Sequence, residues 1–246
     1  MPSLDVKSLH FAWFAGHVLT LLGGTFFILS QLFLHPSNIL YYLTFLGAVI
    51  SYGIVIYQSY GLPSTSGNYI HQLLLDENGH YLSLAIFWLL ISSQQVSIGV
   101  IPYATYSAFH VISFARSNLL GDANKDLQVK MKSWTDTYYG GAMRFVAIIE
   151  VVGITARLVL SLIYPFRVTP LLVYCFFLRF RYLSSSYTRQ AFRDVDQKLA
   201  TVLPPAAKPT YDGFCNMLSR LVNIPLQQQQ QQQQSSSSSN TSTSSN

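Results

Sequence analysis

Residues Leu9–Leu34 read LHFAWFAGHVLTLLGGTFFILSQLFL, and this stretch decides the fold of the chain. Its 26 residues include no Asp, Glu, Lys or Arg. As a helix it would be about 39 Å long, which is enough to cross a hydrocarbon core of about 30 Å with some tilt. A signal peptide has a shorter apolar core of about 7–15 residues. The stretch therefore predicts an uncleaved membrane-spanning helix.

The composition of the whole chain supports the same conclusion. Of 246 residues, 50% are hydrophobic and only 10% are charged, whereas an ordinary soluble domain has about 25% charged residues. The two cysteines, Cys175 and Cys215, are too few for a disulfide scaffold. These numbers exclude a soluble enzyme, a disordered regulator and a disulfide-rich secreted domain, and they favour an integral membrane protein.

Further apolar runs follow the first one. The turn signal His35-Pro36-Ser37-Asn38 predicts that the first two runs form a helical hairpin. The third run has a polar centre, so it is either a second hairpin or one span plus an interfacial helix. The last run would rise only about 17 Å as a helix, which predicts a re-entrant or interfacial arm, or half of a shallow hairpin. Polar sequence between the runs predicts loops at 58–79 and 116–144. The apolar segments are about 9–34, 39–57, 81–115, 145–163 and 168–178.

The sequence after the membrane segments has a different pattern. Ser184-Ser185-Ser186 offers an N-cap for a helix from Tyr187 to Leu203, with apolar residues on one face and basic residues beside them. A basic amphipathic helix next to membrane spans is typical of a membrane-surface helix, although packing on a partner or on the protein's own loops is an equal alternative. The candidate membrane-binding residues are Phe192, Val195, Leu199, Val202, Leu203, Arg189, Arg193 and Lys198.

These observations predict an all-α, polytopic integral membrane protein with helical hairpins and C-terminal amphipathic interfacial helices. Residues 1–182 form the multi-pass membrane domain, residues 183–226 the amphipathic arm, and residues 227–246 a disordered Gln/Ser tail. Eight of the fifteen basic residues lie from Arg167 onward, so the positive-inside tendency predicts a cytosolic C-terminus.

Two charged residues, Glu150 and Arg157, lie inside an apolar run and are candidates for an intramembrane polar site. One hypothesis is a site for an ion, a lipid headgroup or a partner helix. The alternative, which we favour, is that Glu150 bonds a neighbouring helix through Gln94, Gln95 or a serine, while Arg157 extends outward.

Motifs of enzymes and cofactor sites are not found in the sequence. The six histidines show no metal-ligand spacing, and no P-loop, GxSxG or HExxH motif is present. The aromatic residues lie mostly in lipid-length runs, which argues against nucleic-acid binding. We therefore predict no catalytic residues, no metal, no cofactor and no nucleic-acid partner.

Three stretches resemble the transmembrane protein 33 family, which includes pore-membrane proteins of fungal nuclear envelopes and the Krüppel homologue 2 proteins. The stretches are Leu73–Leu82, Ile149-Glu150-Val151 and Phe180–Ser185, followed by Arg189 to Phe192. The resemblance covers roughly residues 5–203. The residues that carry it most clearly are Asp76, Glu77, His80, Tyr81, Arg181 and Tyr182.

The resemblance implies a non-enzymatic protein of the endoplasmic reticulum membrane and nuclear envelope. It implies association with reticulon-type membrane-shaping proteins and with nucleoporins, and a role in tubular reticulum and in nuclear pore assembly or distribution. Hairpins and an amphipathic helix that insert into one leaflet of the lipid bilayer are a physical route to curvature. The alternative is a small transporter or lipid-handling protein built around Glu150.

Overall fold

The computed structural model describes residues 7–35, 37–91, 95–120, 124–163, 168–202, 204, 208–209 and 212–213. All regular structure in these residues is helical. Three stretches in the described part are long and apolar enough to cross a membrane: α1 (Leu9–Leu32), α2 (Asn38–Tyr60) and Ser97–Leu119. The predicted all-α polytopic membrane fold is confirmed. The chain divides into two compact units, Met1–Phe192 and Arg193–Asn246.

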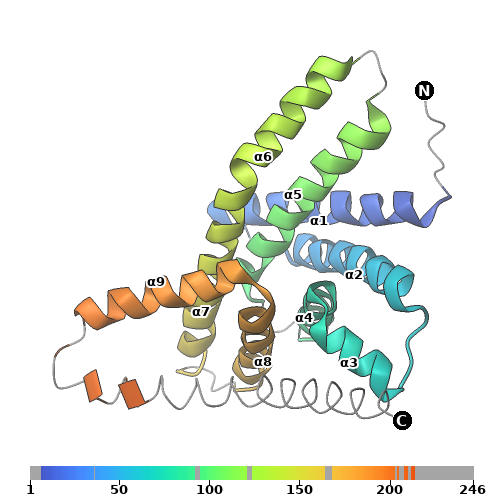
Figure 1. The fold of residues 1–246 in the computed structure, drawn as a ribbon. Helices are drawn as coiled ribbons and strands as arrows, with labels where there is room; N and C mark the ends of the chain where they lie inside the picture. The colour runs from blue at the N-terminus through green and yellow to red at the C-terminus, as the bar shows by residue number, and fades with distance from the viewer. Residues whose placement is uncertain are drawn as a thin grey trace, which may run out of the picture. The chain divides into compact units, whose positions relative to one another are not determined.

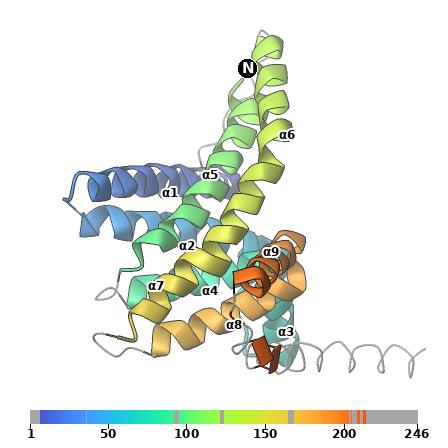
Figure 2. The same ribbon diagram turned by 90° about the vertical axis from the view of Figure 1, so that its left-hand side faces the viewer.

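Helices α1 and α2 lie side by side and form the first hairpin (Figures 1 and 2). Ser8 caps α1 by accepting a hydrogen bond from the Phe11 amide at 3.1 Å. The two backbones approach closely because small residues face each other. A Cβ added at Gly47 would lie 2.6 Å from the Gly16 carbonyl oxygen and 2.7 Å from the Thr20 amide nitrogen. This close packing of small residues is the usual way in which membrane helices associate.

The segment 58–79, predicted as a loop, contains α3 (Gly67–Leu75), and α4 (Glu77–Leu90) begins before it ends. Within the run 81–115 the chain leaves the helix near Ile91 and resumes at η2 (Ser97–Gly99) and α5 (Val100–Phe114). The predicted polar centre of this run therefore does separate two helices. Since α4 has 14 residues, it rises about 21 Å, which is less than a hydrocarbon core.

The predicted loop at 116–144 is wrong. A π-helical turn, η3 (Ala115–Leu119), ends the preceding helix, and α6 (Lys125–Ile148) then continues without a break through the π-helical η5 (Ile149–Ile154) into α7 (Thr155–Leu160). The charged residues at the start of α6 do not prevent a helix. Lys132 and Asp136, for example, form an i,i+4 ion pair at 3.4 Å. Helices α5 and α6 lie side by side (Figures 1 and 2).

The last apolar run lies in α8 (Thr169–Ser184), which extends past residue 178 and carries the basic Arg181 on the same helix. Helix α9 (Ser186–Val202) follows directly. Ser185 Oγ accepts from the Thr188 amide at 3.3 Å, so the predicted serine N-cap is confirmed. The boundary between the two compact units falls within α9, after Phe192.

Candidate functional site

A capping motif fixes the start of α4 and places the polar residues that follow. Asp76 Oδ1 accepts hydrogen bonds from the amides of Asn78 at 2.6 Å and Gly79 at 3.2 Å, while Oδ2 accepts from the Tyr60 hydroxyl at 2.8 Å. Partial burial raises the pKa of the Asp76 carboxyl, but these hydrogen bonds outweigh that effect and leave its pKa below its usual value. The cap therefore joins the end of α2 to the start of α4.

Glu150 lies in the π-helical turn η5 and is 1% exposed. The Tyr81 hydroxyl of α4 donates to its Oε1 at 2.5 Å, and the Tyr174 hydroxyl of α8 donates to its backbone carbonyl at 2.9 Å. Short π-helical turns inside longer helices are often found at functional sites. In this chain, the π-helical turn η5 carries the Glu150 carboxylate in the protein interior, where it meets side chains of α4 and α8.

Arg181 of α8 supplies the cation opposite this carboxylate and is 2% exposed. Its Nε lies 3.6 Å from Glu150 Oε2, and its Nη1 lies 2.9 Å from Glu77 Oε2. Nη2 donates to the Tyr106 hydroxyl of α5 at 3.2 Å, and the guanidinium carbon lies 5.0 Å from the centre of the Tyr81 ring. One guanidinium thus contacts two carboxylates, one hydroxyl and one aromatic ring, which belong to the three segments α4, α5 and η5.

We call this group of Glu77, Tyr81, Tyr106, Glu150 and Arg181 the charge network. It connects α4, α5, η5 and α8, and Tyr103 reinforces it by donating to the Tyr81 carbonyl at 2.9 Å. An ion pair at such depth is strongly coupled to the fold, because removal of one partner leaves an uncompensated buried charge. The interactions that the charge network makes between helices are charge pairing and hydrogen bonds. Among the described residues, no group of three His, Cys, Asp or Glu side chains could hold a metal ion.

Glu150 bonds neighbouring helices, as the favoured interpretation expected, but its described side-chain partners are neither Gln95 nor a serine. Gln95 instead donates to Asn38 Oδ1 at 3.0 Å, and Gln94 lies outside the described residues. The partners are a tyrosine and an arginine from helices distant in the sequence. Arg157 is exposed on α7 and makes no described ion pair with Glu150.

The other residues of the resemblance have structural contacts of their own. The His80 ring stacks on Phe180 at 5.1 Å, and its Nε2 lies 2.6 Å from the Leu74 carbonyl oxygen. The Tyr182 ring packs against Phe192 at 5.5 Å. Sequence reasoning missed Tyr103, Tyr106 and Tyr174. A tyrosine within an apolar run could have indicated them, since a buried hydroxyl needs a partner.

The candidate membrane-binding residues of α9 fall into different environments. Arg189 Nη1 donates to the carbonyls of Tyr182 at 3.1 Å and Leu183 at 2.9 Å, so it closes the end of α8. In the second unit, Leu199 and Val202 are 39% and 82% exposed. Val195 is intermediate, and Arg193 and Lys198 belong to the same stretch of helix. Leu203 lies outside the described residues.

The family can be assigned by comparison with known proteins. The family model described as Transmembrane protein 33/Nucleoporin POM33 matches residues 2–224. The chain belongs to this family. The resemblance drawn from the sequence motifs is therefore confirmed, and in this member of the Transmembrane protein 33/Nucleoporin POM33 family the motif residues Glu77, Tyr81, Glu150 and Arg181 meet in the charge network.

Curated relatives match over most of their length. Nucleoporin POM33 of Chaetomium thermophilum is 28% identical, with 86% of this chain and 88% of the relative covered. Tetra-spanning protein 1 of Schizosaccharomyces pombe is 26% identical, with 90% and 87% covered. Pore membrane protein of 33 kDa of Saccharomyces cerevisiae is 28% identical, with 87% and 84% covered. No solved structure matches the chain.

Proposed function

We propose that this chain is a non-enzymatic membrane protein of the endoplasmic reticulum and nuclear envelope that acts at nuclear pore complexes and helps to shape or organise the membrane. The observation that carries the proposal is the match over nearly the whole chain to relatives named as a nucleoporin and as pore membrane proteins. A further relative of Saccharomyces cerevisiae, 24% identical, is named a pore and endoplasmic reticulum protein. Nucleoporins and reticulon-type membrane-shaping proteins are the proposed partners.

The charge network supports a scaffolding role over transport. A transporter built around Glu150 needs a carboxylate that can meet its cargo, but this one is 1% exposed and is held by Tyr81 and Arg181. Such an arrangement orients helices against one another and disfavours other packings. We therefore assign Glu150 a structural role in the proposed function.

The C-terminal arm is the proposed membrane-shaping element. Leu199 and Val202 are exposed apolar side chains on α9, and basic side chains such as Arg193 and Lys198 belong to the same helix. Insertion of this face into the cytosolic leaflet would bury apolar area and place positive charge near anionic lipid. Phe192 is less informative than the sequence suggested, because its ring also packs on Tyr182.

An environment-sensitive dye on the full-length chain would test this proposal directly. Cys175 and Cys215 are first replaced by serine, and one new cysteine is placed at Val202 or, as the matched control, at Gln197 on the polar face of α9. In vesicles that contain anionic lipid, we expect the dye at residue 202 to shift to shorter wavelength and to be quenched by lipids with spin-labelled acyl chains. The dye at residue 197 should remain in water. Equal behaviour at both positions would exclude a membrane-inserted face.

A fluorescent fusion of the full chain tests the location. We expect a signal at the nuclear rim and reticulum, with part of the rim signal coinciding with a nuclear pore marker. Leu199→Asp together with Val202→Asp should alter pore distribution or reticulum shape, while Gln197→Asp should not. A fusion that is absent from both membranes would refute the proposal.

A further inference from the structure

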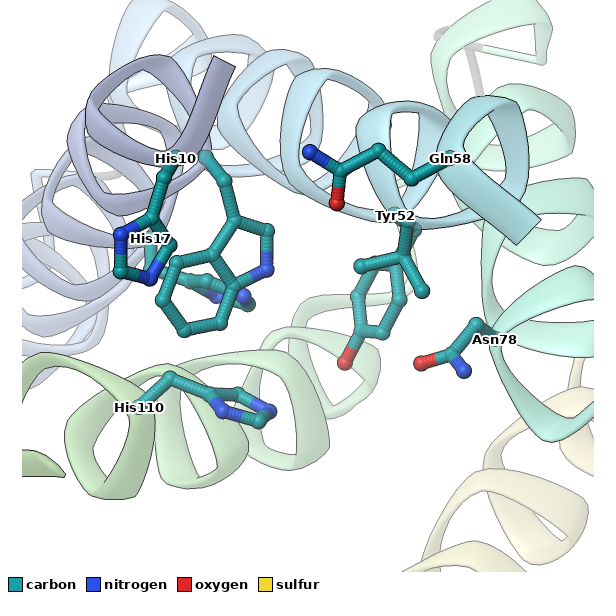
Figure 3. A pocket seen from close by; sticks show the side chains of 8 residues that line it. His10, His17, Tyr52, Gln58, Asn78 and His110 are labelled. Atoms are coloured by element: carbon teal, nitrogen blue, oxygen red, sulfur yellow. The ribbon is translucent and has the colours of Figure 1, made fainter. Parts of the chain in front are cut away.

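A cavity of about 330 Å³ is built from α1, α2, α4 and α5, and none of its lining residues belongs to the charge network (Figure 3). Five of its lining side chains are aromatic or imidazole rings: His10, Trp13, His17, Tyr52 and His110. The sequence had suggested that the histidines are scattered, but helix packing brings three of them to one place. The volume lies at the lower end of the range of small-molecule sites, about 300–1,000 Å³.

The cavity lies at one end of the helices that are long enough to cross a membrane. His10 belongs to the first turn of α1, and Gln58 belongs to the last turn of α2. From these ends, His17 and Tyr52 lie about 12 Å further along their helices at a rise of about 1.5 Å per residue. The cavity therefore extends from the level of lipid headgroups toward the upper acyl chains.

The rings on the α1 and α5 side form a packed cluster that makes one wall of the cavity: His10 stacks on Trp13 at 5.6 Å, and His17 stacks on His110 at 4.4 Å. The Trp13 and His17 rings are 4.8 Å apart at 83°, and the Trp13 and His110 rings are 5.3 Å apart at 72°. Tyr52 closes the other side, 5.9 Å from His17 at 79°, and its hydroxyl points into the space between His110 and Asn78 (Figure 3). Ring faces of this kind attract a cation within about 6 Å of their centres.

The chemistry of the lining selects among lipid headgroups. No Lys, Arg, Asp or Glu is among the described residues that line the cavity. A phosphate on its own would be recognised best by arginine or lysine, which this lining lacks. A quaternary ammonium has no N–H to satisfy, so the ring faces of Trp13 and Tyr52 suffice for it.

Charges of both signs lie beside the cavity, because the first turns of α1 and α4, which carry His10 and Asn78, have the partial positive charge of helix N-termini. The carbonyl end of α2 lies beside Gln58 and carries the partial negative charge of a helix C-terminus. The Asp76 carboxylate, which caps α4 next to the lining residue Asn78, adds a full negative charge nearby.

We propose that this cavity binds the quaternary ammonium headgroup of a choline lipid taken from the surrounding bilayer. The headgroup would lie against Trp13 and Tyr52, with the lipid chains directed into the membrane. The bound headgroup would also support the charge network, because Tyr52 stacks on Tyr81 at 5.6 Å, and Tyr81 in turn donates to Glu150. This binding site lies beyond the proposed organising role and does not depend on it.

Native mass spectrometry of the full-length chain from mixed micelles would test the proposal. The micelles contain equal amounts of phosphatidylcholine, phosphatidylethanolamine and phosphatidylglycerol. We expect the chain to retain phosphatidylcholine preferentially. Trp13→Leu should weaken this retention about fivefold or more, because it removes the best cation-binding ring. Trp134→Leu is the matched control, since Trp134 is an exposed tryptophan on α6 and does not line the cavity.

An analogue with a neutral tert-butyl end in place of the trimethylammonium group keeps the proposal falsifiable even if Trp13→Leu fails to fold. In a dimethylbutyl phosphate lipid, carbon replaces the ammonium nitrogen while the shape is kept. The wild-type chain should retain this lipid less well than phosphatidylcholine and should gain less thermal stability from it. Equal retention of the three natural lipids, equal retention of the tert-butyl analogue, or an unchanged preference in a folded Trp13→Leu variant would each overturn the proposal.

Discussion

Arg181 Nε lies 3.6 Å from Glu150 Oε2 in the interior of the protein, and the two residues come from different helices. Both side chains are almost completely buried. The arginine also reaches Glu77, so it compensates one buried and one half-exposed carboxylate. The position of α8 against η5 and α4 therefore depends on charge compensation, whereas α1 and α2 are joined by the packing of small residues.

Removal of the cation should be costly. We expect Arg181→Met to lower the free energy of unfolding by about 3–5 kcal/mol, because Glu150 would remain buried without its partner. The measurement is thermal or denaturant unfolding of the purified chain in detergent. Addition of Glu150→Gln to this variant should recover part of the loss, with a coupling of about 0.5–3 kcal/mol. Strict additivity of the two changes would contradict the pairing. Lys132→Met, which breaks an exposed pair, should have little effect.

The Tyr81 hydroxyl is expected to contribute separately from the Tyr81 ring. Tyr81→Phe keeps the ring under the guanidinium but removes the donor to Glu150 Oε1. We expect a loss of about 1–3 kcal/mol, because a buried carboxylate oxygen loses its hydrogen bond. Tyr138→Phe is the control, since Tyr138 is 55% exposed on α6. If the two variants unfolded at the same temperature, the hydrogen bond would have no energetic weight.

Alanine substitution of two glycines in α2 should have opposite effects on stability. Gly47→Ala should weaken the α1–α2 hairpin strongly, because the new Cβ would meet backbone atoms of Gly16 and Thr20 at 2.6 and 2.7 Å. Gly53→Ala in the same helix meets nothing within 4 Å, so we expect unchanged or slightly raised stability. Protease resistance and unfolding temperature in detergent would compare the two. Equal tolerance of both substitutions would mean that the helices do not pack as described.

The Asp76 cap predicts a dependence on pH. The pKa of Asp76 is lower in the folded chain than its usual value of about 3.9, so its contribution to stability is present above that value. The contribution is lost as the pH falls through the folded pKa. We expect Asp76→Ala to cost about 0.5–2 kcal/mol at neutral pH and Asp76→Asn to cost less, because asparagine also caps helices. Both variants should lose the part of the acid dependence that Asp76 supplies. An acid profile that matches the wild type in both would refute this assignment.

The C-terminal sequence contains its own test of orientation. Asn240-Thr241-Ser242 is an acceptor triplet for N-glycosylation. If the C-terminus is cytosolic, as we propose, the chain expressed in a eukaryotic cell carries no glycan there. Mobility after glycosidase treatment would check this, with a known lumenal glycoprotein as the control. A glycan at Asn240 would reverse the proposed orientation.

A second acceptor triplet for N-glycosylation, introduced before α6, would report on the number of membrane crossings. Asp126→Ser completes an acceptor triplet that begins at Asn124, just before α6, and has Lys125 in its middle position. A glycan at Asn124 would indicate that 81–115 crosses the membrane once. A chain without this glycan would agree with hairpins throughout.

The sequence alone determined the class of the protein, because absence of charge over a lipid-length stretch is a local property. It predicted the α1–α2 hairpin, the helix break within 81–115, and the serine cap of α9. It also selected Glu150 as unusual and identified the family from short motifs. The wrong predictions arose because polar sequence was interpreted as loop. The charged first half of α6, for example, is helical.

Only the tertiary structure decided which polar residues meet. Glu77, Tyr81, Glu150 and Arg181 come from three separate stretches of the sequence, and Arg181 appeared to be one of many basic residues near the C-terminus. Its burial follows from the extension of α8 beyond residue 178, which carries the guanidinium back against η5. The gathering of histidines around one cavity likewise depends on the packing of α1 against α5. Pairing between distant helices is a property of packing, and no local pattern in the sequence records it.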